Sequence, residues 1–267
     1  MCEFCKKHGD GKKWYFNPKN YAKEIGEARI EILEKIADSR YFERWIINDF
    51  GNIERLKDIP VLNKIATNLG ENYIKKTQGG QIISLSDAVK VLELCENPAL
   101  LPCTCRQLVG EEKYCCLNFG LIPELYKKAN PDEYMEEVSV SKAKRLLREW
   151  DKEGLYHVIL WSKAPYVTSV CNCTAAYCVA YKGRFVSGLK NSMLKGEYVA
   201  RVNEEKCQGC KNCLTRCQFG AISFNVDHGN AFIDIRKCVG CGLCMTECPN
   251  NAIQVTERKF TPAKNLW

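Results

Sequence analysis

Apolar residues at helical spacing dominate the first part of the chain. Residues 19–48 alternate apolar and charged positions without an interrupting proline, and the apolar stripe includes Ile25, Ile32 and Ile36. This periodicity predicts one long helix. A short helix is predicted from Pro60 to Leu69, ending at Gly70. The pair Gly79-Gly80 comes next, and adjacent glycines predict a boundary between parts of the chain.

Helical and strand patterns alternate in the middle of the chain. Ser86 is the predicted N-cap of a helix that runs to about Asn97. Residues 139–154 predict a second helix, with a serine N-cap and a glycine stop. Two apolar segments, 155–161 and 166–170, then predict strands. A helix followed by Gly-Leu and a strand resembles the end of a winged helix, so we expect a winged-helix-like middle region.

The last quarter of the chain is an internal repeat. Residues 202–222 match residues 233–253 at an offset of 31 residues, which predicts two halves related by a pseudo-twofold axis. The turn sequence at 227–230 lies between two short apolar segments and predicts a hairpin of 222–226 with 231–235. Two further strands are expected to pair with each other, near Tyr198–Asn203 and Ile253–Thr256.

Cysteine is the outstanding feature of the composition, with 18 in 267 residues. The first residues, Met1–Lys7, lack the apolar segment of a signal peptide. No apolar run approaches the roughly 18 residues that span a bilayer. We therefore expect a cytoplasmic protein, in which thiols bind metal rather than form disulfides. Such cysteine use also indicates an anaerobic organism.

The formal net charge of +7 comes from Lys and Arg spread along the whole chain. Because the basic residues form no concentrated run, solvated basic faces explain the charge, and nucleic acid is not the expected partner. The chain has neither a Rossmann G-x-G-x-x-G nor a P-loop, so nucleotide binding is not supported. A flavin stays open, because flavin sites share no obligatory motif.

Two runs of four cysteines carry the strongest chemical signal. Each has the spacing C-x2-C-x2-C-x3-C, and Pro249 follows the second run. Three thiolates at this spacing can surround three corners of one [4Fe–4S] cubane, whereas the fourth cysteine points away and reaches the cluster of the other run. The expected ligands of cluster 1 are Cys207, Cys210, Cys213 and Cys248. The expected ligands of cluster 2 are Cys238, Cys241, Cys244 and Cys217. Zinc also accepts four sulfurs, but it would not require a duplicated run with crossed fourth ligands.

This part of the chain, roughly 198–257, resembles the bacterial-type two-[4Fe–4S] ferredoxin family. The resemblance implies single-electron transfer at low potential through two [4Fe–4S] clusters. The sequence departs from the family pattern at Gln218, where a proline usually follows the fourth cysteine; the second half keeps Pro249. Loss of that proline predicts a looser turn and unequal clusters. Residues 1–197 resemble, loosely, uncharacterised Cys-rich regions that precede ferredoxin modules in anaerobes, a likeness that carries no assigned chemistry.

Seven more cysteines form three tight groups that could converge on a third iron–sulfur or other metal centre. They are Cys103, Cys105, Cys115, Cys116, Cys171, Cys173 and Cys178. The favoured ligands among them are Cys105, Cys116, Cys171 and Cys173. Arg106 could offset the charge of such a centre or donate to a sulfur. The alternative is that these are buried free thiols acting as small hydrophobic residues, which suits the isolated Cys95 better than seven cysteines in three groups.

The N-terminus holds a possible weak metal site. Cys2, Cys5 and His8 have a spacing that could seat a metal, although a tetrahedral site needs a fourth ligand. The alternative is a flexible end with incidental thiols. The aromatic triplet Trp14-Tyr15-Phe16 is expected to pack this segment onto the body of the protein.

The patterns and motifs together predict an α+β fold in four parts. These are a mainly helical N-terminal region at 1–80, a Cys-rich, winged-helix-like domain at 81–197, a ferredoxin-like 2[4Fe–4S] module at 198–257 and a C-terminal tail at 258–267.

The expected function is electron transfer by an iron–sulfur protein that serves a larger anaerobic redox enzyme, as a subunit or a dedicated donor. Two alternatives stay open. The first is a reductase with a catalytic extra centre in the region Cys103–Cys178. The second is a redox-sensing regulator.

Overall fold

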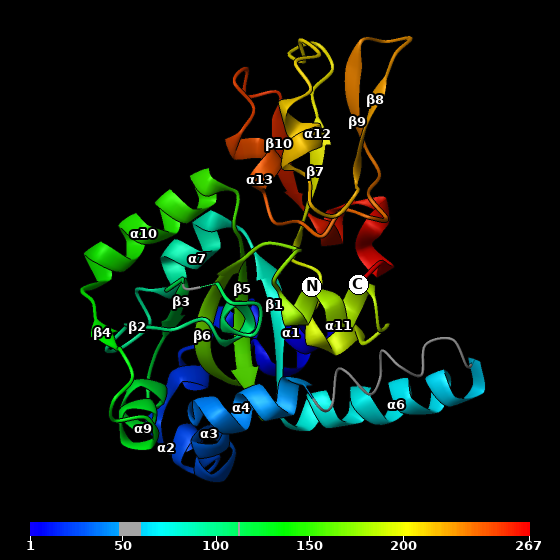
Figure 1. Cartoon of the computed structure of the whole chain (residues 1–267). Helices are drawn as coiled ribbons and strands as arrows, with labels where there is room; N and C mark the ends of the chain where they lie inside the picture. Colours follow the sequence, from blue (N-terminus) through cyan, green and yellow to red (C-terminus); the bar gives the residue numbers. More distant parts are fainter. Residues whose placement is uncertain (48–59, 112) are drawn as a thin grey trace.

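The computed structural model describes residues 1–47, 60–111 and 113–267. A six-stranded sheet lies at the centre of the larger part of the molecule, with strand order β1-β5-β6-β3-β2-β4 (Figure 1). All of its pairings are antiparallel. Its strands are β1 (Gln78–Ile83), β2 (Ala99–Leu101), β3 (Cys116–Asn118), β4 (Glu136–Glu137), β5 (Tyr156–Ser162) and β6 (Tyr166–Cys173).

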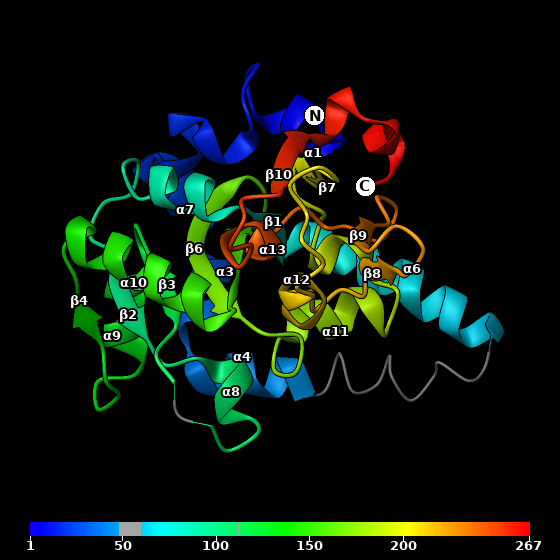
Figure 2. The same ribbon diagram turned by 90° about the horizontal axis from the view of Figure 1, so that it is seen from above.

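Apolar cores on both faces of the sheet bury its central strands. On β5, Ile159 and Trp161 join one core, whereas Tyr156 and Val158 join a second, because successive side chains of a strand point to opposite faces. The first core is completed by α1 (Glu3–His8), η1 (Trp14–Phe16), α7 (Leu85–Val91) and α10 (Val140–Glu153). The second core is covered by α11 (Val179–Phe185) and the segment that includes η4 (Lys190–Ser192), seen from above in Figure 2.

The long helix expected at 19–48 is wrong; four short helices replace it. They are η2 (Pro18–Tyr21), α2 (Lys23–Glu27), α3 (Ile30–Ala37) and α4 (Ser39–Trp45). Ala22 and Asp38 have extended backbone conformations, and the Asp38 carboxylate accepts a hydrogen bond from the Tyr41 amide at 3.0 Å, which caps α4. Helical periodicity detects the apolar face but not the extended residues that divide it. Residue 48 lies outside the described residues.

Helix α6 (Pro60–Lys76) passes through Gly70, so the predicted end at that glycine is wrong. A helix-interior glycine costs only about 1 kcal/mol, which tertiary contacts can override. Glu71, in the same turn, accepts a hydrogen bond from the Asn191 amide at 3.2 Å. This contact ties α6 to the segment around η4.

Strand β1 contains Gly79 and Gly80, which were expected to mark a boundary. A Cβ on Gly79 would collide with the Trp161 ring and would lie 2.5 Å from the Asn191 carbonyl oxygen. A Cβ on Gly80 would collide with Leu160 and Val158. Close packing against side chains of β5 therefore requires both glycines, in a strand that pairs with β5 along its whole length. The division at residue 80 falls inside this strand, and residues on both sides of it share the first core.

The N-cap of α7 is Ser84, not Ser86 as predicted. The Ser84 hydroxyl accepts a hydrogen bond from the Asp87 amide at 3.3 Å, and Ser86 lies in the first turn, where its hydroxyl contacts that of Ser84 at 3.0 Å. The helix ends at Val91 rather than near Asn97. From the sequence, Ser84 and Ser86 are equally good candidates for the N-cap. The extended backbone at Ser84 makes it the cap.

Helix α10 confirms the prediction for 139–154, with Ser139 as N-cap and Gly154 as a left-handed C-cap. The two strands after it are also present as β5 and β6. Their hairpin, however, lies in the middle of the six-stranded sheet, between β1 and β3. A wing is the edge hairpin of a small sheet, so the structure does not show the expected winged-helix arrangement. The two remaining helices of this part are α8 (Thr104–Gln107) and α9 (Ile122–Ala129).

The C-terminal module stands on one end of the sheet domain in Figure 1. Its expected strand pairings are confirmed: β7 (Tyr198–Val202) pairs with β10 (Ile253–Glu257), and β8 (Ile222–Asn225) forms a hairpin with β9 (Asn230–Ile233). A small helix accompanies each cysteine run, α12 (Asn212–Arg216) in the first and α13 (Leu243–Thr246) in the second.

The C-terminal tail, residues 258–267, forms two short turns of helix, η5 (Arg258–Phe260) and η6 (Pro262–Asn265). The Arg258 side chain anchors them. It is fully buried and donates hydrogen bonds to the carbonyl oxygens of Gly196, Tyr198 and Cys238 at 3.0, 2.9 and 2.9 Å. One guanidinium thus joins the tail, the start of β7 and the loop of the second cysteine run.

Candidate metal centres

The eight cysteines of the module line two separate cavities. The first is lined by Cys207, Cys210, Cys213 and Cys248. The second is lined by Cys217, Cys238, Cys241 and Cys244. Each cavity therefore collects three cysteines from one run and the fourth from the other, because each short helix carries its last cysteine away from the loop that holds the first three.

The two cysteine loops have backbones that bend tightly around their cavities. Gly240 has φ +81°, and a Cβ there would collide with the backbone of Tyr198. Backbone amides then point at sulfur: Ala221 donates to Cys217 Sγ at 3.4 Å, and Ala252 donates to Cys248 Sγ at 3.3 Å. These are equivalent positions in the two halves. Such N–H···S bonds tune the reduction potential of a sulfur-ligated cluster.

The two cavities differ in exposure. Cys210, in the first, is exposed, whereas Cys238 and Cys244, in the second, are buried. Burial raises the pKa of the Cys213 thiol, and it raises that of Cys241 to about 12. Buried thiols with raised pKa values lose their protons when a metal binds them, so loading of both cavities releases protons.

Comparison with known proteins matches the model of the 4Fe-4S dicluster domain to residues 200–258. The match covers the module and a minor part of the whole chain. No curated protein matches the chain. The match supports [4Fe–4S] clusters in this region and an iron–sulfur role in electron transfer. In the described part of the chain, every helix is too short or too polar to cross a membrane.

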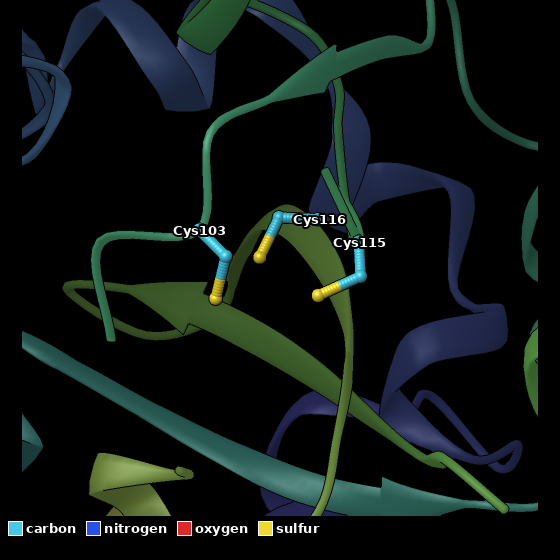
Figure 3. Close-up of side chains that lie close together, drawn as sticks. All are labelled: Cys103, Cys115 and Cys116. Carbon is cyan, nitrogen blue, oxygen red and sulfur yellow. The ribbon is translucent and has the colours of Figure 1, made fainter. Parts of the chain in front are cut away.

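The structure brings the seven upstream cysteines together around one site. The sulfurs of Cys103, Cys115 and Cys116 lie within 4.8 Å of one another (Figure 3). Cys116 pairs directly with Cys171 across β3 and β6, and the Cys116 thiol donates to the Cys171 sulfur at 3.7 Å. The close group therefore includes Cys103 and Cys115, which were not in the set favoured from the sequence.

The thiols of this site influence one another strongly. Hydrogen bonds from Cys105, Cys115 and Cys116 lower the pKa of Cys103 well below its usual range. The hydrogen bond with Cys173 lowers the pKa of Cys178. Mutual hydrogen bonding thus favours the thiolate form at some positions of the group, and the thiolate is the form of cysteine that binds a metal.

Arg106 lies beside these thiols with its side chain only 4% exposed. Burial alone would lower the pKa of its guanidinium, but the nearby Cys115, Cys173 and Cys103 raise it. The guanidinium stacks on the Tyr177 ring, 4.4 Å from its centroid. Its Nε has no hydrogen-bond partner among the described residues. The predicted proximity of Arg106 to the cysteines therefore holds, and one of its donors is available.

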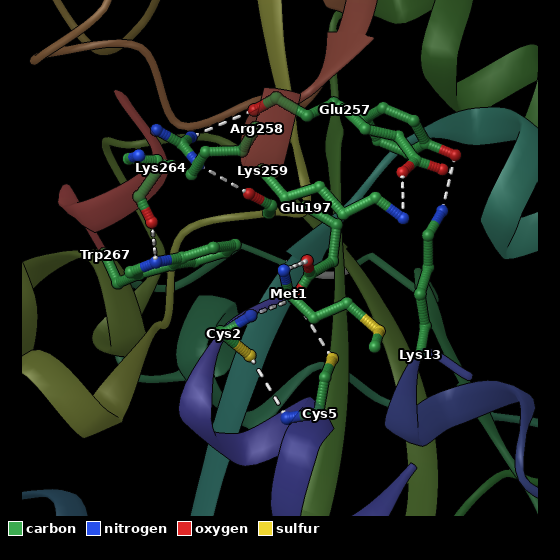
Figure 4. A network of polar contacts seen from close by, with 12 residues as sticks. Met1, Cys2, Cys5, Lys13, Glu197, Glu257, Arg258, Lys259, Lys264 and Trp267 are labelled. Atoms are coloured by element: carbon green, nitrogen blue, oxygen red, sulfur yellow. Dashed lines mark hydrogen bonds and ion pairs between the residues drawn. The ribbon is translucent and has the colours of Figure 1, made fainter. Parts of the chain in front are cut away.

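The N-terminal group contains Cys2, Cys5 and Glu197 rather than His8 (Figure 4). The Cys5 thiol donates to Glu197 Oε1 at 3.0 Å, and the Cys2 amide donates to the same oxygen at 3.1 Å. The His8 ring instead packs on Phe4, with centroids 4.7 Å apart. Glu197 precedes β7, nearly 200 residues from Cys2, so no local spacing could have indicated it. This network joins the first helix to the start of the module.

The triplet Trp14-Tyr15-Phe16 packs as expected, with Trp14 and Tyr15 fully buried. Cys95 is buried outside the seven-cysteine site, and its thiol donates to the Val91 carbonyl oxygen at 3.2 Å. It behaves as a small core residue.

Gln218 has a structural role that the sequence comparison missed. Its Oε1 accepts a hydrogen bond from the Ala175 amide at 2.7 Å, and its Nε2 donates to the Gly154 carbonyl oxygen at 2.6 Å. Ala175 lies in the turn between Cys173 and Cys178. Where the family pattern has proline, this chain has a side chain that docks the module onto the seven-cysteine region.

Proposed function

We propose that this protein transfers single electrons through two [4Fe–4S] clusters with crossed ligands, as a component of a larger redox system in the reducing cytoplasm of an anaerobe. Cluster 1 is held by Cys207, Cys210, Cys213 and Cys248. Cluster 2 is held by Cys238, Cys241, Cys244 and Cys217. The observation that carries the proposal is the lining of the two cavities, each with three cysteines of one run and one of the other.

The exposure of the cavities gives the transfer a direction. Cluster 1, with its exposed Cys210, is the point of exchange with a redox-enzyme partner. Cluster 2 lies inward, because Val239 and Leu243 of its loop pack in the same apolar core as Cys173 and Cys178. Two clusters in one compact module then connect the surface to the interior.

Paired cysteine variants test the ligand sets. In the full chain, purified without oxygen, the double variant Cys213→Ala/Cys248→Ala removes two ligands of one cluster, and we expect it to lose about 4 iron atoms. Cys213→Ala/Cys217→Ala removes one ligand from each cluster, and we expect it to lose about 8. Iron and acid-labile sulfide are measured together with the electron paramagnetic resonance of the reduced protein. The reverse order of losses would contradict crossed ligation.

A reductase is the second candidate function, favoured by an apolar cavity of about 150 Å³ that six of the seven cysteines line in part. Its walls include Phe42 of α4, Ile46 directly after that helix, and Leu160 of β5. Nitrobenzene, a small apolar electron acceptor, can probe it. If the cavity admits substrates, Leu160→Phe should slow oxidation of the reduced protein by nitrobenzene and leave oxidation by ferricyanide unchanged. If Leu160→Phe and the wild type are oxidised by nitrobenzene at the same rate, this candidate is removed.

A further inference from the structure

Six cysteines from four separate segments line a single cavity. Cys103 and Cys105 come from the start of α8, Cys116 from β3, Cys171 and Cys173 from β6, and Cys178 from the N-cap of α11. The cavity lies over the second face of the sheet and has a volume of about 150 Å³. Cys115 is not among the lining residues, but its sulfur lies within 4.8 Å of the sulfurs of Cys103 and Cys116.

We propose that this cavity binds an additional iron–sulfur cluster, with Cys103, Cys116 and Cys171 as its central ligands and Cys105 as the fourth. The first three line the cavity and are linked by close sulfur contacts: Cys103 and Cys116 lie within 4.8 Å of each other, and Cys116 lies 3.7 Å from Cys171. Cys105 shares a turn with Cys103 and lies on the cavity wall. Cys173 and Cys178 also line the cavity.

The number and spacing of the sulfurs favour a polynuclear cluster over a single zinc ion. Structural zinc takes four ligands at about 2.3 Å, so its sulfurs close on the ion and leave no void. Here six cysteines line a cavity of about 150 Å³ instead. Several soft thiolates around one apolar cavity are the donor set of iron–sulfur clusters. Seven cysteines are also more than one zinc ion can use.

The charge of such a cluster has a counterpart in Arg106. A [4Fe–4S] cluster with four thiolates carries about −2, and an uncompensated buried charge is strongly unfavourable. All of the described residues that line the cavity are uncharged. Arg106 follows Cys105 in α8, is 4% exposed and has an unpaired Nε. A cluster held by thiolates in the cavity would supply the negative charge that explains why the Arg106 guanidinium is buried there with its Nε unpaired.

The cysteine-lined cavity also adjoins the ferredoxin-like module, so electrons could pass between cluster 2 and a cluster in the cavity. Cys173 and Cys178 share an apolar core with Val239 and Leu243, which flank Cys241 in the second cysteine run. Gln218, next to Cys217, bonds the turn between Cys173 and Cys178. The turn beside cluster 2 and the cysteine-lined cavity are therefore in direct contact through a shared core. The ligand assignment in the cavity is independent of the one in the module.

Metal analysis of the full chain tests the proposal, with Cys95→Ala as the matched control for loss of a buried thiol. Protein purified without oxygen should hold about 12 iron atoms and as many sulfides per chain. Cys103→Ala/Cys116→Ala should hold about 8, and Cys95→Ala should keep about 12. The module variant Cys213→Ala/Cys248→Ala should also hold about 8, so failure of either assignment is visible separately.

Two results would overturn the proposal. One is about 8 iron atoms in the wild type with no change in Cys103→Ala/Cys116→Ala. The other is one zinc ion per chain that the same double variant loses. If the double variant does not fold, the wild-type iron and zinc contents still decide between these outcomes.

Arg106→Gln provides a readout that a merely structural role would not change. Removing a positive charge beside a cluster makes its reduction less favourable. We expect the midpoint potential of one cluster to become more negative, while the potentials of the two module clusters stay the same. Unchanged potentials for all clusters in Arg106→Gln would contradict the placement of a cluster beside Arg106.

Discussion

Arg258 shows how one side chain can support a site without touching a metal. Its guanidinium bonds three carbonyl oxygens, including that of the proposed ligand Cys238, and burial lowers the pKa of Arg258. The planar fork reaches several acceptors at once, which the single ammonium of lysine cannot do. The residue therefore fixes the start of the second cysteine run in space.

Replacing Arg258 by alanine should lower the free energy of unfolding by at least about 2 kcal/mol, because three buried carbonyl oxygens lose their donor. Arg258→Lys should recover only part of this loss. Urea unfolding of the anaerobic protein measures both, with the exposed Arg201→Ala as control. A loss no larger than that of the control would show that the tail does not depend on Arg258.

Gln218 makes a second residue-scale prediction. Gln218→Pro restores the usual family residue but removes both hydrogen bonds to Ala175 and Gly154, so we expect a loss of about 1–3 kcal/mol in stability. The exposed Gln254→Ala on β10 is the control. Thermal unfolding measures the difference. A more stable Gln218→Pro protein would mean that turn rigidity, not docking, decides this position.

At the scale of elements, β1 illustrates why glycine was misinterpreted. Gly79 and Gly80 lie in a strand whose register with β5 extends from Gln78 to Ile83. Side chains of β5 fill the space on both sides: Trp161 over Gly79, and Val158 with Leu160 over Gly80. Glycine in a strand often marks such a close approach. The strand joins parts of the chain that the sequence had divided.

Gly79→Ala should therefore destabilise the protein by about 1–3 kcal/mol, because the added methyl group displaces Trp161 or the backbone near Asn191. Ser223→Ala, at an exposed position of β8, is the control and should change stability by less than about 0.5 kcal/mol. Denaturant unfolding measures the loss of stability, and tryptophan fluorescence reports the displacement of Trp161. Native stability in Gly79→Ala would mean that Trp161 can move without cost.

The whole molecule is held together across the boundary of the module. Phe219 contacts the rings of Tyr156, Tyr181 and Phe185 at centroid distances of 5.1, 5.8 and 5.7 Å. Arg216 donates to the carbonyl oxygens of Asp151 and Lys152 at the end of α10, where a cation also complements the helix dipole. The module therefore shares an aromatic core with the part of the chain that holds the six-stranded sheet, and its Arg216 caps the C-terminal end of α10.

We expect the wild-type protein to unfold in one cooperative transition for this reason. The double variant Arg216→Ala/Phe219→Ala should split the calorimetric transition into two, one for the module and one for the sheet domain. Phe232→Ala, an exposed residue of β9, should leave a single transition. Two transitions in the wild type would show that the shared core does not couple the parts.

The sequence by itself determined the module. The two cysteine runs, their repeat at a fixed offset and the turn between β8 and β9 are local signals, and local spacing is enough to predict strands, hairpin and eight candidate ligands. It also determined α10 with both caps, because capping depends on residues within one turn. The seven upstream cysteines could be singled out by their grouping, and Arg106 by its position among them.

Tertiary structure alone decided which distant residues meet. Strand pairing of β3 with β6 places Cys116 against Cys171, and the folded loops bring Cys103 and Cys115 to the same point. Glu197 joins Cys2 and Cys5 across the length of the chain, and Gln218 meets Ala175 only when the module docks. A pattern along the chain records spacing over a few residues. These contacts depend on how strands pair and cores fill, and so they could not be read from the sequence.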